Sequence, residues 1–147
     1  MKIGAQLYTV RDFARTTEDF SETLKKVADI GYRTVQVSGT CAYEAEWLRD
    51  ELVKNGLECV ITHTPISDIR DKTEKVCRDH GIFGCRNIGI GAIPGGKLTD
   101  EVYEKFVLDF APVSKRIAEA GYKLFYHNHA FEFSRPEFGS LRWWCQI

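Results

Sequence analysis

The 147-residue sequence predicts an α/β protein with a parallel sheet. Short apolar runs alternate with longer segments of helical periodicity, in the order β-α-β-α-β-α-β-α-β. Each predicted helix ends at a glycine, and a strand begins within a few residues. The strands show no clean alternation of polar and apolar residues, which is typical of a sheet covered on both faces. This order implies right-handed βαβ units in one domain.

The predicted strands are short and rich in β-branched residues, as in Thr34-Val35-Gln36-Val37. A polar connection is expected at residues 9–15, after the first strand. Thr64-Pro65 prevents simple continuation of the third strand. No low-complexity linker divides the chain. The five strands are expected at residues 3–8, 34–38, 57–62, 86–90 and 123–127.

The predicted helices carry recognisable end signals. Thr16 is a suitable N-cap for the first helix, and Gly31 would end it in a left-handed conformation. Thr99 caps a long fourth helix that ends at Gly121. Pro112 lies inside that helix and would kink or split it. The two remaining helices are expected at about residues 43–54 and 71–80.

Composition excludes several classes of function. Lys and Arg number 20 against 21 Asp and Glu, so no nucleic-acid or membrane-surface partner is expected. No apolar run is long enough for a transmembrane helix, and polar Gln6 comes too early for a signal peptide. The five cysteines form no C-x-x-C pair, which favours free thiols in a reducing cytoplasm.

Two parallel architectures compete, an open dinucleotide-binding sheet and a barrel. The open sheet would place G-x-G-x-x-G after the first strand, where this chain has residues 6–12 without a glycine. The glycine-rich residues 89–96 lack the Lys-Ser/Thr of a P-loop and are better explained as a strand-to-helix loop, although a phosphate role stays open.

The stretch at residues 126–133 contains two imidazoles and a carboxylate. His127 and His129 point to the same side of an extended chain, and a turn could bring Glu132 back to them. Such a group can bind a divalent metal or transfer protons. The simpler alternative is that strand-end histidines only form hydrogen bonds with loops.

Polar residues also gather at the predicted carboxyl ends of other strands. In a (β/α)8 barrel these ends form the active site, which favours the barrel over the open sheet. Each residue alone has a simpler explanation, such as packing for Tyr8 or a loop contact for Gln36. The polar residues at these ends are Gln6, Tyr8, Gln36, Ser38, His63, His127, Asn128 and His129.

Four phrases of the sequence resemble the sugar phosphate isomerase/epimerase family with the xylose isomerase-like TIM barrel. The resemblance covers about residues 1–133 and implies a partial (β/α)8 barrel of about five parallel strands and four helices. Residues 134–147 do not resemble the family and form a separate tail in this interpretation. The phrases are GAQLYTVRD at residues 4–12, TVQVSG at 34–39, THTP at 62–65 and YHNHAFEF at 126–133.

The resemblance implies proton transfer next to a carbonyl through an enediol(ate), with a divalent metal such as Mn, Mg or Zn. The substrate would be a small sugar or sugar phosphate. Glu132 and His63 are then the candidate catalytic residues. The candidate metal ligands are His127, His129 and Glu132, and the candidate substrate-binding residues are Gln6, Tyr8, Gln36, His63 and Asn128.

The chain departs from the family pattern in its length. A complete barrel needs about 250 residues, and the metal ligands that the family carries on strands six to eight have no counterpart here. A truncated barrel exposes sheet edges, so we expect a homodimer or higher oligomer, with the Trp-rich tail as a candidate cover. A half-barrel without turnover is therefore the alternative function. The related endonuclease branch is disfavoured by the balanced charge.

Overall fold

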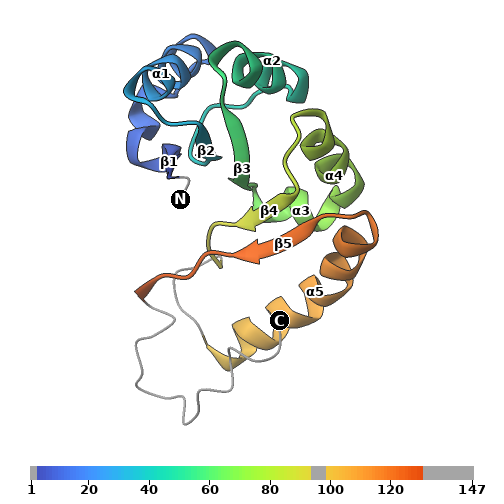
Figure 1. Ribbon diagram of the computed structural model, residues 1–147. Coiled ribbons are helices and arrows are strands. Elements are labelled where there is room, and N and C mark those ends of the chain that lie inside the picture. The colour runs from blue at the N-terminus through green and yellow to red at the C-terminus, as the bar shows by residue number, and fades with distance from the viewer. Residues whose placement is uncertain (1–2, 94–98, 131–147) are drawn as a thin grey trace.

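The computed structural model describes residues 3–93 and 99–130, and Glu132 and the tail at residues 134–147 lie outside them. The described chain forms one parallel sheet in which each strand pairs with the next in sequence, as Figure 1 shows. The α/β prediction is therefore confirmed. The strands are β1 (Gly4–Gln6), β2 (Thr34–Val37), β3 (Glu58–His63), β4 (Asn87–Ile90) and β5 (Lys123–Tyr126).

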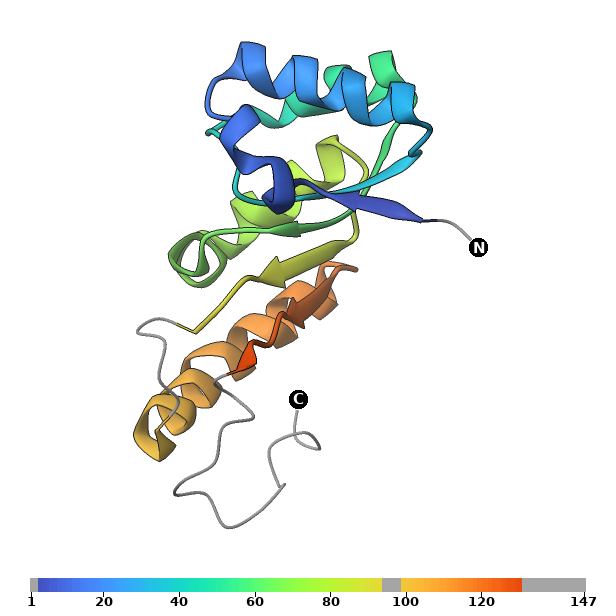
Figure 2. The ribbon, with the colours of Figure 1, turned by 90° about the vertical axis from the view of Figure 1, so that its left-hand side faces the viewer.

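The helices lie on the outer side of a curved sheet (Figures 1 and 2). Because the strand order never reverses, successive right-handed crossovers place every helix on the same face. A doubly wound sheet needs a reversal and helices on both faces, so the strand order is that of a barrel. The helical segments are η1 (Leu7–Phe13, 3₁₀), α1 (Thr17–Ile30), α2 (Ala45–Asn55), α3 (Ile66–Asp71), α4 (Thr73–Ile82) and α5 (Asp100–Glu119).

Two apolar clusters fill the layer between sheet and helices. The first joins β2 and β3 to α1 and α2, and Phe20, Val35 and Leu48 are fully buried there. The second joins β4 to α3, α4 and α5 around Ile88 and Ile117. These clusters hold the helices against the sheet, and the other face of the sheet carries the residues of the candidate site.

The predicted helix ends are confirmed where a cap was recognised. The Thr16 side chain accepts a hydrogen bond from the Asp19 backbone N–H at 3.1 Å. Thr99 accepts one from the Val102 N–H at 3.2 Å. Gly31 ends α1 with a φ of 114°, a left-handed conformation that favours glycine.

The start of the chain differs from the prediction. The first strand is only Gly4–Gln6, and the expected polar connection is a 3₁₀ helix, so Tyr8 is not a strand residue. The Thr9 hydroxyl donates to the Gln6 carbonyl at 2.7 Å, and Leu7 is fully buried. The hydrogen bond and the burial of Leu7 both favour a turn of the chain immediately after Gln6.

Three helix predictions also need correction. The second helix begins at Ala45, and residues 43 and 44 lie outside it. The third is two helices, because Lys72 adopts a non-helical conformation between α3 and α4. Residues 3–93 and 99–130 thus contain five α-helices in place of the expected four. Pro112 does not split α5, which stays continuous at this exposed position. Within the described residues, no helix is long and apolar enough to cross a membrane.

Candidate functional site at the carboxyl ends of the strands

The candidate site is built on the carboxyl ends of β2 and β3. Gln36 is in β2, buried Ser38 follows that strand, and His63 is the last residue of β3. Because the strands are parallel, their carboxyl ends lie at one edge of the sheet. Gln6 closes β1 in register with Gln36, so it lies beside this group in the sheet.

His63 is held by hydrogen bonds at both ring nitrogens. Its Nε2 lies 2.7 Å from the Gln36 amide nitrogen, and its Nδ1 lies 3.0 Å from the Ser38 hydroxyl oxygen. Because the Gln36 amide nitrogen can only donate, Nε2 accepts. A neutral ring then carries its proton on Nδ1 and donates it to Ser38. The two strand-end side chains therefore fix both the orientation and the tautomer of this imidazole.

The environment of His63 favours the neutral ring. Burial lowers the pKa of His63, and the nearby imidazoles of His127 and His129 lower it further. The half-buried ring can therefore accept a proton at neutral pH, provided that Gln36 releases Nε2.

The two histidines of the H-x-H motif extend the group from β5. The His127 ring lies 5.1 Å from that of His63, and the His129 ring lies edge-on 4.8 Å from that of His127. The His127 backbone N–H donates to the Ile90 carbonyl at 2.9 Å, which anchors this residue beside β4. Both histidine side chains are exposed. The structure thus joins the histidines at positions 63, 127 and 129 into one chain of rings.

Two glycines give His63 its space. Gly89 is in register with His63 on β4, and a Cβ there would lie 2.4 Å from the Thr62 carbonyl oxygen and 3.1 Å from the His63 ring. A Cβ on Gly91 would lie 3.3 Å from His63 Nδ1. The sequence interpretation treated this region as a loop and missed its role. Glycines two residues apart beside a strand-end histidine were the available signal.

The remaining predicted residues occupy different places. Tyr8 lies in η1, about half exposed, with the Arg11 guanidinium 4.5 Å from its ring centre. It also packs closely on Gly39, where a Cβ would lie 2.7 Å from the tyrosine ring. Asn128 is exposed and lies between His127 and His129, just after the end of β5. The catalytic and metal-binding assignment of Glu132 falls outside the described residues.

The described residues do not complete a metal site. No group of three or more His, Cys, Asp or Glu side chains within residues 3–93 and 99–130 is arranged to hold a metal ion. His127 and His129 offer imidazole ligands, but a stable divalent site needs further donors. The arrangement can bind hydroxyl groups through amide and hydroxyl side chains and can accept a proton at His63.

Solved structures share this fold at low sequence identity. A sugar phosphate isomerase/epimerase from Parabacteroides distasonis matches with a TM-score of 0.70 and 19% identity, over 91% of this chain and 57% of that one. An AP endonuclease of family 2 from Brucella melitensis matches with a TM-score of 0.64 and 19% identity, over 86% and 55%. A D-psicose 3-epimerase matches with a TM-score of 0.57 and 15% identity, over 84% and 51%.

These matches establish the fold as part of a TIM barrel. The chain spans about half the length of the structures that it matches. Their different activities show that the fold alone does not select a reaction. No protein-family model and no curated protein matches the chain.

Proposed function

We propose that the strand-end site binds a small sugar or sugar phosphate and forms part of a metal-dependent isomerase or epimerase site. The supporting observation is the imidazole of His63, which lies within hydrogen-bond distance of Gln36 and Ser38 and beside the ring of His127 on a barrel-type sheet. The similarity to isomerase and epimerase structures favours proton transfer next to a carbonyl through an enediol(ate). The four described cysteines are free thiols, consistent with a cytoplasmic location.

In this proposal His63 moves a proton at Nε2, because that nitrogen accepts a hydrogen bond and its partner Gln36 can rotate away. Gln6, Gln36, Tyr8 and Asn128 would bind substrate hydroxyl groups. A resident metal would polarise substrate oxygens, with ligands from His127, His129 and Glu132. The described residues leave the ligand set of the metal incomplete. The proton transfer proposed here therefore depends on His63 and not on the metal.

A second candidate is a half-barrel that binds metal or sugar without turnover. The incomplete ligand set among the described residues favours it. A second copy of the chain could supply missing donors, so a homodimer or higher oligomer belongs to the catalytic proposal. A nucleic-acid substrate is not favoured, because 20 basic residues face 21 acidic ones.

The first experiment measures Mn²⁺ binding by calorimetry to the wild type and to the double variant His127→Ala/His129→Ala. The control is Asn128→Ala, which changes the residue between the two histidines and leaves both rings in place. We expect near-stoichiometric binding that is lost in the double variant and kept in the control. Equal binding by all three proteins, or by none, would contradict the metal assignment.

The second experiment separates turnover from binding. D-fructose and D-fructose 6-phosphate are incubated with the protein in D₂O, and deuterium at carbons next to the carbonyl is followed by NMR. Exchange that disappears in His63→Gln supports proton transfer, whereas binding without exchange supports the half-barrel alternative. Light scattering on the same samples gives the oligomeric state, and a sharp monomer peak would remove the second copy as a source of ligands.

A further inference from the structure

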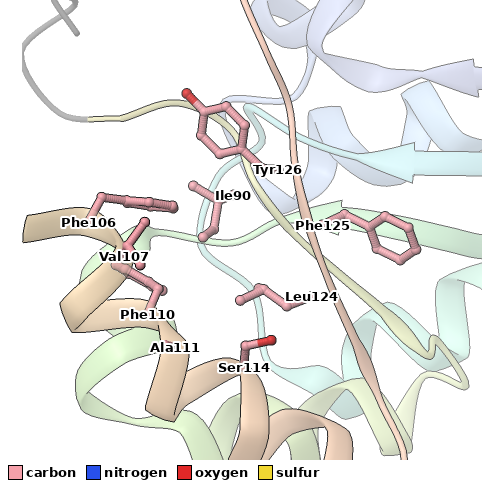
Figure 3. A pocket seen from close by; sticks show the side chains of 9 residues that line it. All are labelled: Ile90, Phe106, Val107, Phe110, Ala111, Ser114, Leu124, Phe125 and Tyr126. Carbon is pink, nitrogen blue, oxygen red and sulfur yellow. The ribbon is translucent and has the colours of Figure 1, made fainter. Parts of the chain in front are cut away.

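An apolar hollow of about 200 Å³ lies between α5 and the sheet, apart from the candidate site. Figure 3 shows side chains of α5 converging on it from one side and those of β4 and β5 from the other, whereas Phe125 points to the other side of β5. The rings of Phe106 and Phe110 stack at 4.8 Å, and Tyr126 meets Phe106 edge-on at 5.7 Å. Aromatic side chains thus form much of the wall.

The hollow fits one aromatic side chain better than a metabolite. It is smaller than the roughly 300–1,000 Å³ of typical ligand pockets, and an apolar cavity of about 150 Å³ is enough for a benzene-sized molecule. Its rim on α5 continues into exposed apolar surface, because Ala111 is exposed and the Leu108 side chain is 75% exposed. An apolar occupant would cover both the hollow and this rim.

Residues 131–147 provide a suitable occupant within the same chain. They follow Ala130, four residues beyond Tyr126 in the wall of the hollow. Trp143 is thirteen residues beyond Ala130, a span of up to about 45 Å when extended, whereas a 20-residue helix is about 30 Å long. The segment can therefore reach any part of α5. Its large apolar residues are Phe131, Phe133, Phe138, Leu141, Trp143, Trp144 and Ile147.

We propose that residues 138–147 of the same chain dock on α5 and that the indole of Trp143 or Trp144 fills the hollow. Arg142 precedes the two tryptophans, and exposed Glu104 lies three residues before Val107 on α5, so one pair of opposite charges is available. A short tether keeps a segment at an effective concentration in the millimolar range, which favours the chain's own tail over a second copy at working concentration.

The test uses tryptophan fluorescence of the full chain carrying Trp47→Phe. The ring centres of Trp47 and Phe20 lie 5.3 Å apart in the first apolar cluster, and phenylalanine at position 47 conserves the aromatic character. The remaining emission then comes from Trp143 and Trp144 alone. Val107→Asp places a charge in the wall of the hollow. Val53→Asp is the matched control, because it makes the same change at an exposed position on α2.

We expect blue-shifted emission with little acrylamide quenching in the background protein and in Val53→Asp. Val107→Asp should shift the emission to the red and increase quenching, while circular dichroism stays unchanged. If Val107→Asp unfolds, Ala111→Phe, which fills the hollow from an exposed position, serves instead and should give the same red shift. Solvent-exposed emission in the background protein would overturn the proposal. Blue-shifted emission that is lost on dilution would also overturn it, since a second copy would then be the occupant.

Discussion

Gly89 is the position where one added carbon should have the clearest effect. Its φ lies outside the left-handed region, so alanine can adopt the backbone conformation of β4. At such a position Gly→Ala ordinarily stabilises a protein by about 0.4–1 kcal/mol, because it restricts the unfolded chain. Here the new Cβ would lie 2.4 Å from the Thr62 carbonyl oxygen, a backbone atom of the paired strand β3. The distance between β3 and β4 must therefore increase at this point.

The loss of stability expected for Gly89→Ala can be compared with that of Gly91→Ala. Overpacking of this kind costs about 1–3 kcal/mol. With a urea m-value of about 2 kcal/mol/M, a loss of about 2 kcal/mol lowers the unfolding midpoint by about 1 M. Gly91→Ala is the matched control, because the three atoms nearest to its Cβ all belong to the His63 side chain, with Nδ1 at 3.3 Å. That ring can shift by a few tenths of an ångström, so its midpoint should change little.

The assay is urea unfolding followed by circular dichroism for the wild type and both variants. An unchanged m-value is required, so that a lower midpoint reports stability. A Gly89→Ala protein as stable as the wild type would refute the close approach of β3 and β4. An equal loss in both variants would mean that the neighbouring carbonyl is not the cause.

Two further predictions concern a helix end and a buried imidazole. Thr16→Ala removes the N-cap of α1 and should lower the unfolding free energy by about 1 kcal/mol, whereas Thr16→Ser should retain it; equal losses in urea unfolding would contradict the cap. Burial lowers the pKa of His80 below its unfolded value of about 6.5. The contribution of the neutral ring to the free energy of unfolding is therefore complete above about pH 6.5 and is lost as the pH falls. His80→Gln should flatten this loss in unfolding measured from pH 7 to 5, and an unchanged slope would refute it.

The strands and caps were predictable because their signals are local. β-branched runs such as residues 34–37 mark strands, and Thr16 and Thr99 have the side chain that an N-cap needs. The break at Lys72 had no such signal, since no glycine or proline lies between α3 and α4. The 3₁₀ helix after β1 depends on the burial of Leu7, which is a tertiary effect.

The candidate site was predictable in outline only. Parallel strands bring Gln36, Ser38 and His63 to one edge, so their proximity follows from strand ends alone. The 5.1 Å separation of the His63 and His127 rings depends on strand register across β4, which no sequence pattern specifies. The catalytic, substrate-binding and metal-binding roles of these residues remain predictions.

The sequential strand order also has a consequence for how the protein is made. Each strand from β2 to β5 pairs with the strand that the ribosome synthesised just before it. The nascent chain can therefore add one strand and its covering helix at a time, without waiting for a distant partner. At each stage the newest strand offers its free edge to the next one. Assembly from the amino terminus would extend the sheet at one edge only, while the outer edge of β1 stays the same throughout translation.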